Sequence, residues 1–203
     1  MIRKPYKNTH RIIIQPGEYY ASNTQEVIST LLGSCVAACL YDPVNNVIGM
    51  NHFLLAYKHH SFNKSLIESD EGRYGIHAMD LLINDMMAKG ANRENIKAKC
   101  FGGGDVLNLY GYLGDQQSVG GANVDFIREF LKRENIPITG SSLGGNNGRN
   151  VHFVGGDFSV YIKKIGQKRE QLVQQQERTY WQKTITEHER LATKITDNQS
   201  EFW

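Results

Sequence analysis

The chain has 203 residues, of which 40% are hydrophobic and 22% charged, and its formal net charge is +2. These values fit one domain of ordinary size, and the near-balance of charge argues against a nucleic-acid-binding protein, which usually has a strongly basic face. Three cysteines are too few for a disulfide-stapled scaffold and favour a reducing cytoplasmic location.

Apolar runs in this chain are short. None approaches the roughly 20 residues that a membrane-spanning helix needs, so we expect no membrane insertion. Residues 1–10 are polar and basic, and the apolar residues 12–14 are broken by Gln15-Pro16-Gly17, so no signal peptide is predicted.

The first predicted elements are two strands separated by a loop. Residues 11–14 and 26–32 are typical of strands, and residues 17–24 of a loop. The second strand leads into a turn at Gly33 and Ser34, directly before Cys35.

Residues 36–55 predict a β-hairpin. Two apolar runs, 36–41 and 47–55, flank residues 42–46 (DPVNN), whose Pro, Asp and Asn favour a turn. A turn centred between Pro43 and Val44 places Cys35 opposite His52, about 5 Å away. A turn centred one residue later makes them diagonal neighbours on the same face, about 7 Å apart. A register shifted the other way would separate them, because side chains alternate between faces.

A thiol beside an imidazole is the minimum for an activated cysteine nucleophile, because the imidazole favours the reactive thiolate. Free cysteine is also a common buried space-filler, so Cys35 could simply belong to the core. Cys39 lies on the same strand face and could be core or, with Cys35 and His52, half of a metal site. No CxxC or HxxxH pair is present, so we predict no metal.

The remaining elements alternate between helix and strand. Residues 74–89 and 123–133 have the apolar spacing of amphipathic helices, while the polar residues 58–71 predict an exposed loop. Strands are expected at 96–101, 136–141, 149–154 and 158–165. The glycines at 102–104 follow a strand without the other residues of a phosphate-binding loop, so we expect a close backbone approach there. With no strict βαβ repeat, the pattern predicts an α+β fold, a layered α/β sandwich with a mixed sheet core and flanking helices.

Residues 166–203 differ in character from the rest. They are rich in Gln, Glu, Lys, Arg and Thr and carry a thin apolar stripe that includes Val173, Tyr180 and Leu191. This pattern predicts an extra C-terminal helix that lies on the domain or projects from it. We therefore expect a main domain at 1–165 and a polar helical extension at 166–203.

Several motifs in the same order resemble the CheD family of chemoreceptor glutamine deamidases. Residues 29–37 (STLLGSCVA) and 49–55 (GMNHFLL) carry the candidate cysteine and histidine. Residues 98–104 (AKCFGGG), 119–124 (VGGANV) and 144–151 (GGNNGRNV) continue the likeness, which covers roughly residues 15–165.

The resemblance implies a protein-glutamine deamidase with Cys35 as nucleophile and His52 as its base. In CheD-like proteins a threonine six residues before the cysteine completes the site; here that position is Ser29, with Thr30 beside it, and family spacing favours Ser29. Backbone N–H groups around Gly33 and Ser34 are the natural oxyanion donors.

The same resemblance implies substrates and partners. It implies no cofactor, substrates in the cytoplasmic helices of chemoreceptors, weak methyl-esterase chemistry on the same receptors, and in some members binding to a CheC-like phosphatase. An arginine often precedes the Asn-Val pair in this family, and Ala122 stands there instead. The alternative hypothesis is a largely non-catalytic adaptor that holds receptors or a phosphatase; no local signature supports a general cysteine peptidase.

Overall fold

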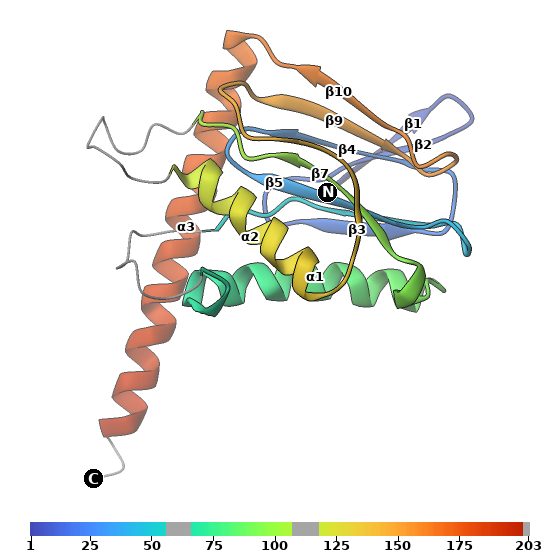
Figure 1. The fold of residues 1–203 in the computed structure, drawn as a ribbon. Helices are drawn as coiled ribbons and strands as arrows, with labels where there is room; N and C mark the ends of the chain where they lie inside the picture. The colour runs from blue at the N-terminus through green and yellow to red at the C-terminus, as the bar shows by residue number, and fades with distance from the viewer. Residues whose placement is uncertain (56–65, 107–117, 201–203) are drawn as a thin grey trace.

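The fold is a sandwich of two mixed β-sheets with two helices packed on one outer face (Figure 1). The structure is a computed structural model that describes residues 1–55, 66–106 and 118–200. The α+β class expected from the sequence is confirmed. Within the described ranges, no helix combines the length and apolar content needed to cross a bilayer.

The first sheet has the strand order β1-β2-β4-β9-β10. Its strands are β1 (Ile2–Tyr6), β2 (Thr9–Ile13), β4 (Val27–Leu32), β9 (Arg149–Val154) and β10 (Val160–Lys164). The strands β2 and β4 run parallel, and the other neighbours are antiparallel. The sequence did not predict β1, whose residues are almost all exposed and lack apolar alternation.

The second sheet has the order β3-β6-β5-β7-β8, with a parallel pair at β7 and β8. Its strands are β3 (Tyr19–Ser22), β6 (Val47–Asn51), β5 (Val36–Asp42), β7 (Lys97–Gly102) and β8 (Ile138–Leu143). The expected loop at 17–24 is therefore partly wrong, because β3 pairs with the buried strand β6 there.

The helices complete the architecture. They are α1 (Asp70–Ala88), α2 (Val119–Arg133), α3 (Gln167–Ser200) and the short 3-10 helices η1 (Leu66–Glu68) and η2 (Arg93–Asn95). Of the loop predicted at 58–71, residues 58–65 lie outside the described residues, and the rest forms η1 and the start of α1.

The molecule has two apolar cores, one between each pair of adjacent layers. One cluster fills the space between the two sheets and includes Ile28, Leu32, Cys35, Cys39 and Phe153. A second lies between the second sheet and helices α1 and α2. Because side chains of β5 alternate between these clusters, the strand is buried on both faces, which explains its unbroken apolar run. In Figure 1, α3 runs along one end of both sheets and extends past α1.

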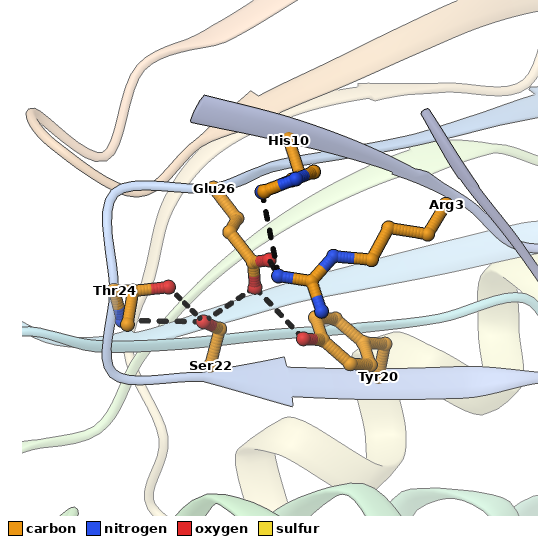
Figure 2. Close-up of polar contacts among 6 residues, drawn as sticks. All are labelled: Arg3, His10, Tyr20, Ser22, Thr24 and Glu26. Carbon is orange, nitrogen blue, oxygen red and sulfur yellow. Dashed lines mark hydrogen bonds and ion pairs between the residues drawn. The ribbon is translucent and has the colours of Figure 1, made fainter. Parts of the chain in front are cut away.

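Two local polar arrangements hold the strand ends. The Asp42 carboxylate accepts hydrogen bonds from the backbone N–H groups of Val44 and Asn45 at 2.8 and 3.0 Å, which forms the predicted hairpin turn. Figure 2 shows the second, in which buried Glu26 accepts hydrogen bonds from Tyr20 and Ser22 on β3 and from Arg3 on β1. Glu26 thereby joins an edge of one sheet to an edge of the other.

Candidate active site

Cys35 lies in the turn between β4 and β5, where the chain passes from the first sheet to the second. Its side chain faces the apolar cluster between the sheets and is fully buried. The strand ladder pairs Cys39 with Met50, and an isolated bridge pairs Val36 with Phe53. This is the later of the two productive registers predicted, so Cys35 and His52 are diagonal neighbours on one face.

The two side chains meet as the register requires. The Cys35 sulfur and a ring nitrogen of His52 lie within 4.8 Å of each other. His52 is 2% exposed, and burial lowers its pKa to about 3, so the ring is neutral near pH 7. The predicted meeting of thiol and imidazole is confirmed; its catalytic role remains a prediction.

The hydrogen bonds of Thr30 define the tautomer of His52. The Thr30 hydroxyl donates its single proton to the carbonyl of Ile14 at 2.8 Å. It must therefore accept from the Nδ1–H of His52, which lies 2.7 Å away. The lone pair of the ring is then on Nε2, a buried atom with no hydrogen-bond partner among the described residues. An imidazole in this state can accept a proton from a thiol.

The expected contact between Ser29 and His52 is wrong. The Ser29 hydroxyl lies 2.8 Å from Nδ1 of His152, its cross-strand partner on β9. Successive residues of a strand point to opposite faces, so only one of Ser29 and Thr30 can reach His52. The pairing of β4 turns Ser29 toward His152 and leaves Thr30 at His52, one residue later than the family spacing indicated.

The turn residues Gly33, Ser34 and Cys35 direct three backbone N–H groups at one carboxylate. Those of Gly33 and Ser34 donate to Glu177 at 2.7 and 2.8 Å, and that of Cys35 donates at 3.2 Å. The Ser34 hydroxyl adds a fourth hydrogen bond at 2.7 Å. We call the three backbone N–H groups of Gly33, Ser34 and Cys35 the N–H cluster. It binds an anionic oxygen beside the Cys35 sulfur, as an oxyanion hole would.

The glycine-rich loop at 102–104 binds the carbonyl groups of the turn at 33–35. The N–H of Gly103 donates to the Cys35 carbonyl at 2.7 Å, and that of Gly104 donates to the Gly33 carbonyl at 2.8 Å. Gly102 has a φ of +108°, and a Cβ there would lie 2.2 Å from the Cys35 carbonyl oxygen. The expected close backbone approach at 102–104 is confirmed, and it explains why glycine stands there.

Asn123 is a part of this site that the sequence did not predict. Its side chain is fully buried; it accepts from the N–H of Leu55 at 2.8 Å and donates to the Ser34 carbonyl at 3.1 Å. Asn123 thus joins α2 to the turn and to the segment after His52. The signal was the motif at 119–124, where the buried polar residue stands on the apolar face of a helix.

Glu177 is the second residue that sequence analysis missed. It comes from α3, is 1% exposed, and lies on the same helical face as Val173, four residues before it, and Tyr180, three residues after it. That position on the apolar stripe was the available signal. A carboxylate on such a stripe needs buried donors, which the N–H cluster provides.

The Glu177 carboxylate also affects the pKa of the Cys35 thiol. Burial raises the pKa of Cys35 well above its ordinary value, and the Glu177 charge and hydrogen bond raise it further, because a second negative charge beside the first is unfavourable. In this arrangement Cys35 is a neutral thiol.

Cys35, His52 and Glu177 are also the one group of potential metal ligands that the described residues bring together, and Cys39 is not among them. The fit to a metal ion is poor. The two Glu177 oxygens already accept four hydrogen bonds, and thiolate, the form that binds zinc, is disfavoured at Cys35. We derive no chemistry through a metal.

A buried cysteine, a neutral imidazole of defined tautomer and N–H donors beside the sulfur are the groups that a thiol-dependent amidohydrolase uses. The family model described as CheD chemotactic sensory transduction matches residues 55–164. The chain belongs to the CheD family.

Curated relatives agree over most of their length. "Probable chemoreceptor glutamine deamidase CheD 1" of Geobacter sulfurreducens is 46% identical over 180 residues, which cover 89% of this chain and 90% of the relative. "Probable chemoreceptor glutamine deamidase CheD 2" of Shewanella oneidensis is 48% identical over 170 residues, 83% of this chain and 84% of the relative. A solved structure, hypothetical protein YfiH of Bacillus licheniformis, aligns with a TM-score of 0.37 and 16% identity over 61% of this chain and 49% of the other, which supports no conclusion.

Proposed function

We propose that this protein converts specific glutamine side chains of chemoreceptors to glutamate. The observation that carries the proposal is the convergence of Cys35, the His52–Thr30 pair and the N–H cluster at one buried point. Family membership and the printed names of the relatives support the substrate.

The geometry supports a two-stage mechanism. Nε2 of His52 takes the thiol proton, and the Cys35 sulfur attacks the carboxamide carbon. The N–H groups of Gly33, Ser34 and Cys35 stabilise the negative oxygen that forms. The C–N bond then breaks, and the His52 proton leaves with the nitrogen as ammonia. Thr30 holds the ring in the tautomer that this transfer requires.

The second stage releases the product. Water, deprotonated by His52, attacks the thioester carbon; the C–S bond breaks and the thiol is restored as the carboxylate leaves. The overall change is addition of water and loss of ammonia, and it requires no cofactor. A glutamine converted to glutamate adds a negative charge to a receptor helix, which changes its packing and signalling balance.

The proposed substrate indicates where in the cell the protein acts. Chemoreceptor signalling helices lie in the cytoplasm, so we propose a cytoplasmic location, and a CheC-like phosphatase as a further partner. We also propose that residues 1–165 form the deamidase domain and that 166–203 form a polar helical extension.

The decisive experiment is mass spectrometry of a receptor cytoplasmic fragment incubated with the wild-type protein, C35A or C39A. We expect a gain of about one dalton per modified glutamine with wild type and C39A and none with C35A, since loss of a nucleophile typically costs orders of magnitude in rate. Cys39 is the matched control because it is equally buried but lies outside the site. Receptor binding without any mass gain would support the adaptor instead.

A further inference from the structure

The position of Glu177 raises a question that the deamidation mechanism does not answer. A deamidase binds glutamine and releases glutamate, and here a glutamate side chain fills the N–H cluster beside the nucleophile. Its carboxylate oxygen lies within 4.8 Å of both the Cys35 sulfur and a His52 nitrogen. It therefore occupies the position that the mechanism assigns to the reaction product.

The backbone that carries Glu177 is an α-helix, as in the proposed substrate. Four residues earlier, Val173 packs on Gly33, where an added Cβ would lie 3.0 Å from the valine methyl. Three residues later, Tyr180 packs on Gly17 and its hydroxyl meets that of Tyr74. These contacts define a groove that accepts one face of a helix, with an apolar side chain four residues before the central residue and a larger one three residues after it.

Other polar contacts anchor this segment at both sides of the groove. The Gln174 amide donates to the Val106 carbonyl at 2.9 Å, and the Glu170 carboxylate accepts from the N–H of Gly148 at 3.0 Å. Gln175 and Gln176, in contrast, are exposed. Of the four consecutive residues from 174 to 177, only Glu177 therefore enters the site.

We propose that α3 occupies the substrate-helix groove as an internal product mimic, so that a receptor helix must displace it before deamidation can begin. This inference rests on the proposed function. Because Glu177 belongs to the same chain, it competes with a receptor glutamine for the N–H cluster at a high effective concentration. Val173 and Tyr180 indicate which side chains a receptor helix presents on either side of its glutamine.

The E177Q variant tests the proposal within a single protein. It places a carboxamide where the product carboxylate lies, with almost unchanged shape. Cys35 then attacks this carboxamide, ammonia leaves, and water hydrolyses the thioester, so position 177 returns to glutamate. We expect peptide mapping of purified E177Q to show a gain of about one dalton at position 177, and none at the exposed Gln175 and Gln176. E177Q combined with C35A should retain its glutamine.

A second variant tests displacement. E177A removes the carboxylate and should deamidate the receptor fragment at least about tenfold faster than wild type, because a larger fraction of molecules has an open groove. The matched control is R178A. Arg178 is exposed on the same helix, so this variant should deamidate the receptor fragment at the wild-type rate. Thermal unfolding of each variant verifies that the fold is intact.

The outcomes separate this inference from the proposed function. If E177Q keeps its glutamine and E177A is no faster than wild type while both deamidate the receptor, the internal mimic is wrong and the deamidase stands. If neither the receptor nor position 177 changes in any variant, both proposals are wrong.

Discussion

Thr30 is the residue whose single hydroxyl determines the tautomer of His52, the proposed catalytic base. It donates to the Ile14 carbonyl and accepts from Nδ1 of His52, so it leaves Nε2 free for the thiol proton. T30V keeps the branched shape and removes both contacts. We expect a fall in kcat of about 10–100-fold with little change in KM, measured on a receptor fragment.

Two variants of the same strand control this prediction. T30S keeps the hydroxyl and should recover most of the rate. S29A removes a hydroxyl that contacts His152 rather than His52 and should remain near the wild-type rate. Equal losses in T30V and S29A would contradict the role of Thr30.

The thiol itself reports on Glu177. Burial and the Glu177 charge together raise the pKa of Cys35, so E177A should lower that pKa by removing the charge and opening the site. We expect faster alkylation by iodoacetamide in E177A than in wild type at pH 8. A quantitative comparison with C35A corrects for Cys39 and Cys100, which are also buried; an unchanged rate would show that α3 does not shield the thiol.

Glu26 contributes to stability rather than to the site. Burial alone would raise its pKa, but hydrogen bonds from Tyr20 and Ser22 and the Arg3 charge outweigh burial and hold the pKa below its ordinary value of 4.5. The stability it contributes is therefore fully present above pH 4.5 and is lost as the pH falls through the lower folded-state pKa. E26Q should cost about 1–3 kcal/mol at pH 7.

Urea unfolding at two pH values checks this. The difference in unfolding free energy between wild type and E26Q should shrink at pH 3. E94Q, at an exposed carboxylate, should change stability by less than about 0.5 kcal/mol at pH 7. A pH-independent difference for E26Q would show that shape, not ionisation, matters there.

At the scale of elements, the loop after β7 determines the position of the turn that carries Cys35. G102A would introduce a Cβ 2.2 Å from the Cys35 carbonyl at a positive φ. G90A also has a positive φ, but no atom lies within 4 Å of its added Cβ. We expect G90A to cost about 1–2 kcal/mol and G102A clearly more, with reduced deamidation only in G102A; thermal unfolding and receptor assays measure both.

The elements that sequence analysis predicted well are those with a strong local pattern. The apolar stripe of α1 and the turn residues at Asp42 are local signals. One of the registers that this turn allows is observed, and it brings Cys35 to His52. The strands β1 and β3 were missed because they are short and their burial depends on partners elsewhere in the chain. The choice between Ser29 and Thr30 failed for a similar reason, since it depends on which face of β4 meets the second sheet.

At the scale of the whole molecule, the least predictable contact is the most informative one. The Gly33 N–H and the Glu177 carboxylate lie 144 residues apart in the chain. No local sequence pattern predicts a contact between a glycine turn and a polar helix. In the sequence, Glu177 is therefore hard to distinguish from the other charged residues of a solvated segment. Cys35, His52 and the C-terminal helix were each predicted from the sequence, but the position of that helix against the site was not.

The strand order of the first sheet also affects how the protein is made. Strand β4, which carries Thr30, is held between β2 and β9, and β9 begins only at Arg149. Pairing segments so far apart costs loop-closure entropy before it stabilises anything, so folding is slow compared with a helical chain of this length. A nascent chain that ends before Arg149 contains Cys35 and His52 but lacks the strand that supports their partner. The proposed nucleophile therefore gains its full structural support only after the chain has been made through β9.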